Sequence, residues 1–130
     1  MKILVVDDDD AVRNTIIDIL ISADYEVESS SNGEEALERL KSDKFDLVIT
    51  DIIMPKKSGV ALLDFIRSSD YKIPVLAVSG HSSQTASDTL NFAGHLADKI
   101  LAKPFEPDDL LETVEKLLLK TGASSLYGRR

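Results

Sequence analysis

Short apolar runs alternate with amphipathic stretches along this chain, and that alternation restricts its fold more than any other feature. Continuous apolar runs lie at residues 3–6, 47–50, 75–78 and 100–102, whereas residues 25–28 alternate polar and apolar side chains. Continuous apolar runs are typical of strands covered on both faces, and alternation is typical of a half-exposed strand. We therefore predict five strands, with residues 25–28 at an edge of the sheet.

Helical periodicity separates these strands. Apolar residues recur at helical spacing in five stretches, at 12–21, 36–40, 62–66, 82–94 and 107–118. In the first stretch we place Ile21 on the buried face, and Ser31 with Glu34 has the spacing of a capping box that begins the second. Strict alternation of strands and helices predicts an α/β doubly wound fold, with a parallel sheet, right-handed crossovers and helices on both faces.

The composition fits one soluble domain and excludes several functions. The chain has 130 residues, no cysteine and a net charge of −8, which excludes disulfides and thiolate metal sites and argues against nucleic acid as a partner. No apolar run approaches the ~20 residues of a membrane span, and no signal-peptide pattern follows Met1, so we expect a cytoplasmic protein without a membrane segment. We predict one domain over 1–120 and a flexible C-terminal tail over 121–130, where Gly and Ser become frequent.

Polar or charged groups, one of them a glycine backbone N–H, follow four of the predicted strands. They are Asp7 and Asp8 after the first strand, Asp51 after the third, Ser79 and Gly80 after the fourth, and Lys103 after the fifth. Because the carboxyl ends of parallel strands meet at one edge of a sheet, we expect these groups to converge there. The run of four aspartates then divides: Asp7 and Asp8 would bind a metal, while Asp9 and Asp10 would begin the first helix, where its dipole favours acids.

This set of groups suits phosphoryl chemistry. Carboxylates without cysteine or clustered histidine fit a hard cation, Mg²⁺ or alternatively Mn²⁺. A divalent cation and the Lys103 ammonium would neutralise charge on a transferring phosphoryl group, and Ser79 and Gly80 can bind the same oxygens. Asp51 is then the natural nucleophile, which would form an acyl phosphate.

The motifs that carry these residues are VVDD at 5–8, ITDIIMP at 49–55, VSG at 78–80 and AKPF at 102–105. In this order the set closely resembles the receiver domains of two-component response regulators, over residues 2–120. The resemblance implies a flavodoxin-like (βα)5 fold with strand order 2-1-3-4-5. It also implies a signalling phosphoacceptor rather than an enzyme, with intrinsic autophosphorylation and autodephosphorylation.

Carried over residue by residue, the resemblance implies a role for each acid. Asp51 would accept a phosphoryl group from a phosphohistidine on a histidine kinase or a histidine phosphotransfer protein. Asp8 would bind Mg²⁺ directly and Asp7 directly or through water, with Asp51 and the carbonyl of Ile53 completing the protein ligands. Ile53 would also border the phosphoryl group and the path of an attacking water.

The remaining residues would bind the phosphoryl group and relay its presence. Lys103 would pair with Asp51 before phosphorylation, and Ser79, Gly80 and Lys103 would then bind the phosphoryl oxygens, with a cis peptide before Pro104. Movement of Ser79 would shift the face made by the fourth helix, the fifth strand and the fifth helix, where a downstream protein would bind. The family's usual aromatic switch residue is replaced here by Ile100, so this face would respond through backbone and loop shifts alone, or weakly.

Three alternatives stay open. A Mg²⁺-dependent phosphohydrolase would also pass through an aspartyl phosphate, although such enzymes usually place a second aspartate at the position of Ile53. A degenerate receiver would bind partners without phosphorylation, although every charged group needed for phosphorylation is present. The chain is either a stand-alone receiver, which its length favours, or a piece of a longer regulator. We also expect either a monomer or a phosphorylation-dependent dimer.

Overall fold

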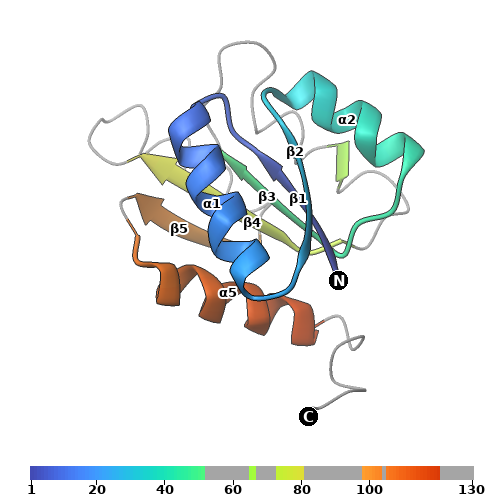
Figure 1. Cartoon of the computed structure of the whole chain (residues 1–130). Coiled ribbons are helices and arrows are strands. Elements are labelled where there is room, and N and C mark those ends of the chain that lie inside the picture. The colour runs from blue at the N-terminus through green and yellow to red at the C-terminus, as the bar shows by residue number, and fades with distance from the viewer. Residues whose placement is uncertain (52–64, 67–72, 81–97, 104, 121–130) are drawn as a thin grey trace.

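The computed structural model describes residues 1–51, 65–66, 73–80, 98–103 and 105–120. Its elements are β1 (Lys2–Val6), α1 (Asp10–Ser22), β2 (Glu26–Ser30), α2 (Gly33–Ser42), β3 (Leu47–Asp51), β4 (Val75–Gly80), β5 (Lys99–Lys103) and α5 (Pro107–Lys120). The strands form one parallel sheet in the order β2-β1-β3-β4-β5 (Figure 1). The predicted doubly wound, flavodoxin-like fold is therefore confirmed, and β2 is an edge strand as expected.

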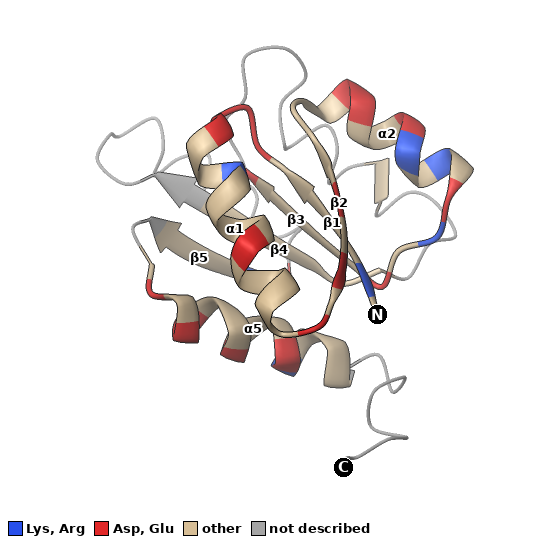
Figure 2. Cartoon of the chain, in the orientation of Figure 1, with Lys and Arg blue, Asp and Glu red and all other residues tan. Residues whose placement is uncertain are grey.

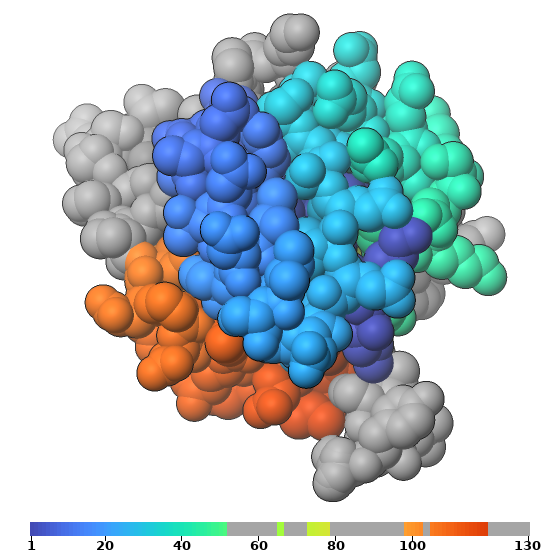
Figure 3. Space-filling view, in the orientation of Figure 1, coloured from blue at the N-terminus to red at the C-terminus, as the bar shows by residue number. Residues whose placement is uncertain are grey.

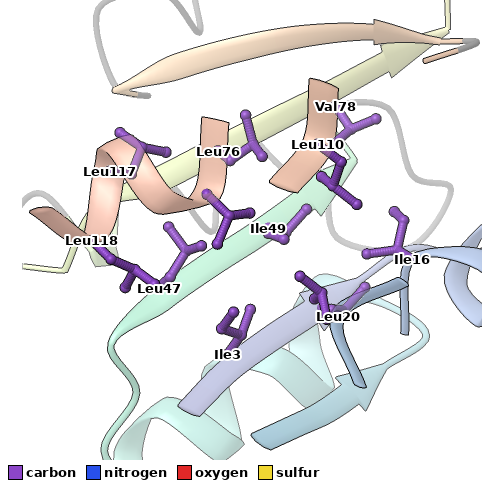
Figure 4. Close-up of a cluster of buried hydrophobic side chains, with 12 residues drawn as sticks. Ile3, Ile16, Leu20, Leu47, Ile49, Leu76, Val78, Leu110, Leu117 and Leu118 are labelled. Atoms are coloured by element: carbon purple, nitrogen blue, oxygen red, sulfur yellow. The ribbon is translucent and has the colours of Figure 1, made fainter. Parts of the chain in front are cut away.

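Apolar strands at the centre of the sheet are covered on both faces. One core lies under α1 and α5, whose inward side chains meet those of β1, β3 and β4 (Figure 4). The opposite core lies under α2 and contains Leu4, Val6, Ala36, Leu40 and Val48. Burying one leucine or isoleucine side chain stabilises the fold by about 1.5–3 kcal/mol, so these two layers account for the continuous apolar runs.

The two helices of the first face touch each other as well as the sheet (Figure 3). Tyr25, in the turn after α1, packs against this core, and burial with the nearby charge of Glu115 raises its pKa. Ile21, which we had predicted on the buried face, is 54% exposed, so that prediction is wrong. Ile16 and Leu20 fill the contact between α1 and the sheet. Each residue of a helix is rotated by about 100° from the one before it, so Ile21, which follows Leu20, points away from that contact.

The start of α2 differs from the prediction by one residue. The N-cap is Asn32, whose side chain accepts a hydrogen bond from the Glu35 N–H at 2.9 Å. Glu35 in turn accepts from the N–H of Ser31 at 3.2 Å. The predicted pair of Ser31 with Glu34 is therefore wrong, because the same four-residue spacing also fits Asn32 with Glu35.

An ionic network links α2 to the start of β1 and to the middle of β2, away from the carboxyl ends of the strands. Lys2 pairs with Asp43 and with Glu28, and Arg39 pairs with Glu28 at 2.6 Å. The hydrogen bond to Asp43 raises the pKa of Lys2, and the same bond lowers the pKa of Asp43. The Lys2 ammonium also lies 5.3 Å from the centre of the Phe45 ring.

Two predicted helices fall mostly outside the described residues. Within the stretch at 62–66, residues 65 and 66 are helical and Ile66 is fully buried in the core under α2. The stretch at 82–94, the cis peptide at Pro104 and the tail at 121–130 lie outside the described part of the chain. Among the described helices, none is long and apolar enough to cross a membrane.

Candidate functional site

The loop between β1 and α1 presents the aspartates at the carboxyl edge of the sheet (Figure 2). Asp7 follows β1 directly and is 1% exposed, whereas Asp8 is exposed. One carboxylate oxygen of Asp7 accepts a hydrogen bond from the Asp9 N–H at 2.9 Å. Asp9 is the N-cap of α1 and accepts from the N–H groups of Ala11 and Val12. These hydrogen bonds fix the positions of Asp7 and Asp9 relative to the first turn of α1.

Asp51 lies at the end of β3, the central strand of the sheet. It is 8% exposed, and its main-chain carbonyl accepts a hydrogen bond from the buried hydroxyl of Thr50 at 3.0 Å. Its strand pairs with β1 on one side and with β4 on the other, where Asp51 lies opposite Val78. Thr50, the residue before Asp51, pairs with β1, and Asp51 itself pairs with β4, so the backbone that carries the Asp51 side chain has little freedom.

The carboxylates of Asp7, Asp8 and Asp51 come together although the residues are far apart in sequence. One oxygen from each lies within 4.8 Å of one from each of the others. Two unit negative charges at that separation repel by roughly 1 kcal/mol in water and about 3.5 kcal/mol at an effective dielectric constant of about 20. The predicted convergence of these acids is confirmed, and their mutual repulsion favours a bound cation.

The donor set fits a divalent cation that prefers oxygen. Oxygens bound to one Mg²⁺ at about 2.1 Å lie at most about 4.2 Å apart, and Mg²⁺ usually keeps several waters. The three carboxylate oxygens lie within 4.8 Å of one another. They would bind one Mg²⁺ after small side-chain rotations, or with a water between the ion and one of the acids. Two of the three acids are nearly buried, which reduces competition from bulk water.

The other predicted site residues lie partly outside the described structure. Gly80 ends β4 opposite Lys103 at the end of β5, and Ser79 lies opposite Ala102. Their backbones therefore reach the same edge as Asp51, while the side chains of Ser79 and Lys103 lie outside the described residues, as does all of Ile53. The convergence of the acids is thus observed, and the contacts of these three residues stay predictions.

Ile100, the predicted replacement for an aromatic switch, lies on the edge strand β5. Its side chain is 37% exposed, which is unusual for a large apolar residue in the described part of this chain.

Sequence reasoning missed one residue beside the acids. Arg13, in the second turn of α1, donates a hydrogen bond from its guanidinium to the main-chain carbonyl of Asp7 at 2.8 Å. The same guanidinium pairs with Asp10. The available signal was the separation of three residues between Asp10 and Arg13, which brings opposite charges together on a helix.

Comparison with protein families identifies the family of this chain. The family model described as "Response regulator receiver domain" matches residues 3–115. The chain belongs to this family. It is thus a receiver domain of the kind found in two-component systems, and its acids occupy the carboxyl edge of the sheet, where the resemblance had placed them.

The receiver domain has curated relatives that are about twice its length. It is 34% identical to "Transcriptional regulatory protein DltR" of Streptococcus agalactiae over 97% of this chain and 54% of the relative. It is 36% identical to "Response regulator MprA" of Mycolicibacterium vanbaalenii over 93% of this chain and 52% of the relative. The chain therefore spans about half the length of the curated relatives it matches.

Solved receiver structures match the whole sheet. A CheY-like receiver domain protein from Methanospirillum hungatei has a TM-score of 0.81 at 32% identity, and the match covers 92% of this chain and 94% of that one. TrrA, a response regulator from Thermotoga maritima solved in complex with Mg²⁺ and BeF, has a TM-score of 0.79 at 36% identity, over 89% of this chain and 97% of that one. TrrA thus binds Mg²⁺, and the chemistry of the acid cluster in this chain also suits that ion.

Proposed function

We propose that this receiver domain accepts a phosphoryl group on Asp51 and that Mg²⁺ bound by Asp7, Asp8 and Asp51 is required. The observation that supports this most strongly is the approach of the three carboxylates to within 4.8 Å at the end of the central strand. A lone acid at a strand end would simply be solvated. Three acids, two of them nearly buried, are tolerated where a cation offsets their repulsion.

The transfer step is a substitution at phosphorus. A carboxylate oxygen of Asp51 attacks the phosphorus of a phosphohistidine, an O–P bond forms, and the P–N bond breaks. The bonding electrons leave on the imidazole nitrogen, which takes up a proton, and Asp51 becomes an acyl phosphate. A small acyl phosphate would serve as donor in the same way, with a carboxylate as leaving group, and water attack on the aspartyl phosphate would return Asp51 to its free form.

The chain's own residues would hold the group in place. The β4–β5 register brings Ser79, Gly80 and Lys103 to the edge where Asp51 lies, and we propose that the Ser79 hydroxyl, the Gly80 N–H and the Lys103 ammonium bind the phosphoryl oxygens. The main-chain carbonyl of Ile53 would add a metal ligand beside Asp51. When bound, Mg²⁺ would neutralise charge on the phosphoryl oxygens as they approach the acids.

The partners follow from this chemistry. A histidine kinase or a histidine phosphotransfer protein would supply the phosphoryl group, and a downstream protein would bind the face that includes β5. The exposed Ile100 on this edge strand supports that placement, because a half-exposed isoleucine gives a partner apolar area to bury. We expect the domain itself not to contact nucleic acid, given its net charge of −8, whereas the transcriptional role named for DltR belongs to a protein nearly twice as long.

Incubation with acetyl phosphate, followed by intact mass measurement, tests the proposal. Wild type should gain about 80 Da, one phosphoryl group, with Mg²⁺ or Mn²⁺ present and should gain nothing in EDTA. Asp51→Asn should gain nothing under either condition, while Asp18→Asn, on the exposed face of α1, should behave as wild type.

An unmodified wild type in Mg²⁺ would refute the phosphoacceptor role. Rapid multiple turnover of added phosphate esters would instead favour the phosphohydrolase alternative.

A further inference from the structure

Arg13 directly contacts the loop that carries two of the three acids. Its guanidinium donates to the Asp7 carbonyl at 2.8 Å and also pairs with Asp10. The side chain of Arg13 is only 16% exposed, whereas that of Asp10 is 81% exposed. An arginine that buries most of its length to reach a main-chain carbonyl does so at a cost in side-chain entropy, which the two contacts must offset.

The helix explains how Arg13 reaches the loop. Side chains in an α-helix point back toward its N-terminus, so a long side chain in the second turn extends over the first turn and the cap. Asp10 begins α1 and Arg13 follows three residues later, which is the spacing of neighbouring side chains. The planar guanidinium reaches the Asp7 carbonyl with one terminal nitrogen and Asp10 with the other, so the two contacts share one fixed fork.

The carbonyl that Arg13 binds belongs to the peptide group between Asp7 and Asp8. Holding that carbonyl fixes the orientation of the peptide plane, and with it the directions in which the two side chains leave the backbone. The next peptide N–H, that of Asp9, is bound by the Asp7 carboxylate at 2.9 Å. Arg13 and Asp9 thus restrain the loop from its two sides.

We propose that Arg13 is a positioning residue that presets Asp7 and Asp8 for the divalent cation. The inference rests on the proposed metal site and adds a residue that the resemblance does not assign. Arg13 holds the loop in its metal-binding shape before the ion arrives, so that the ion does not have to order the loop itself. Partners of metal-ligating residues typically change metal affinity by about 10- to 100-fold when they are removed.

The charge of Arg13 and its hydrogen bonds have opposite effects on the affinity of the site for a divalent cation. A positive charge near the site repels a divalent cation, so removing the charge alone would tighten binding, by roughly twofold after screening by salt. Removing the hold on the loop would weaken binding by about tenfold, at the lower end of the range for such partners. The sign of the change in affinity therefore distinguishes positioning from simple electrostatics.

The test is a titration of Arg13→Gln with MgCl₂, followed by amide NMR shifts of residues 7–10. Arg39→Gln is the matched control, because it removes the same charge from an arginine that pairs with Glu28 in the middle of β2, away from the acid cluster. We expect the dissociation constant for Mg²⁺ to rise about fivefold in Arg13→Gln relative to Arg39→Gln, the roughly tenfold loss of positioning reduced by the roughly twofold gain from the removed charge. An equal or lower dissociation constant in Arg13→Gln would overturn the inference.

A second measurement needs no metal. In metal-free protein the Asp9 N–H should exchange with solvent faster in Arg13→Gln than in wild type or Arg39→Gln, while amides within β1 keep their protection. Unchanged exchange at Asp9 would show that Arg13 does not hold the loop. If wild type itself fails to bind Mg²⁺, the proposed metal site is refuted, and this exchange experiment still decides the role of Arg13.

Arg13→Lys replaces Arg13→Gln, under the same criteria, if the latter does not fold. A lysine keeps the charge but lacks the planar fork by which Arg13 contacts the Asp7 carbonyl and Asp10 from two separate nitrogens.

Discussion

Replacing Asp51 with asparagine should stabilise the metal-free protein. Asp51 takes part in two of the three carboxylate pairs, with Asp7 and with Asp8, each within 4.8 Å. The repulsion between Asp51 and buried Asp7 is nearer about 3.5 kcal/mol, the value for an effective dielectric constant of about 20. The repulsion between Asp51 and exposed Asp8 is nearer roughly 1 kcal/mol, the value in water. An amide accepts hydrogen bonds less well than a carboxylate and would weaken the pairing predicted between Asp51 and Lys103, which offsets part of this gain. We expect a net increase of about 1–2 kcal/mol in the free energy of unfolding, small beside the gross repulsion.

Urea unfolding in EDTA measures this change, with Asp18→Asn as the control for net charge. The control residue lies on the exposed face of α1, so its substitution should change the unfolding free energy by less than about 0.5 kcal/mol. When MgCl₂ is added at concentrations above its dissociation constant, the free energy of unfolding of wild type should rise with the logarithm of the Mg²⁺ concentration. The free energy of unfolding of Asp51→Asn should rise much less. A destabilised Asp51→Asn in EDTA, or equal stabilisation of both proteins by Mg²⁺, would refute the reasoning.

Two further predictions concern stability away from the acids. Asn32→Ala removes the cap that binds the Glu35 N–H and should lower the free energy of unfolding by about 1 kcal/mol in urea; no loss would contradict the assigned cap. Burial, with the charge of Glu115, raises the pKa of Tyr25, so its contribution to stability is complete below the ordinary phenol pKa and is lost as pH rises through the folded value. Tyr25→Phe should therefore flatten the fall in stability measured as pH rises from about 9 through the ordinary phenol pKa of 10.0 and above, and an unchanged slope would contradict this.

The four aspartates at 7–10 have four different surroundings. Asp7 is buried and accepts from the Asp9 N–H, Asp8 is exposed within the acid cluster, Asp9 caps α1, and Asp10 pairs with Arg13. Four adjacent like charges are thus tolerated because two of them meet helix N–H groups or a cation. The repulsion that remains is concentrated where a metal would bind.

The sheet and the acid cluster could be predicted from sequence because both depend on simple regularities. Continuous apolar runs identify β1, β3 and β4, and alternation with helices leaves a parallel sheet as the consistent arrangement. A parallel sheet brings all strand ends to one edge, so Asp7, Asp8 and Asp51 had to approach one another. No side-chain detail was needed for either conclusion.

Other features depend on side-chain geometry that spacing does not determine. Two overlapping four-residue spacings fit a cap for α2, and only the structure shows that Asn32 and Glu35 are used. Whether Ile21 is buried depends on how α1 is rotated against the sheet, which the apolar stripe gives only to within about one residue. The hydrogen bond from Arg13 to the Asp7 carbonyl forms only in one of the many rotamers that a long side chain can adopt, and the sequence does not show which rotamer is used.

Locating the phosphoryl group on the chain tests the central claim most directly. Borohydride reduces an aspartyl phosphate to homoserine, which lowers the mass of that residue by about 14 Da and survives digestion into peptides. After treatment with acetyl phosphate and Mg²⁺, we predict homoserine at position 51 and none when Mg²⁺ is replaced by EDTA. Homoserine at position 7 or 8 in place of 51, or an unreduced Asp51 in a protein that has bound Mg²⁺, would contradict the account.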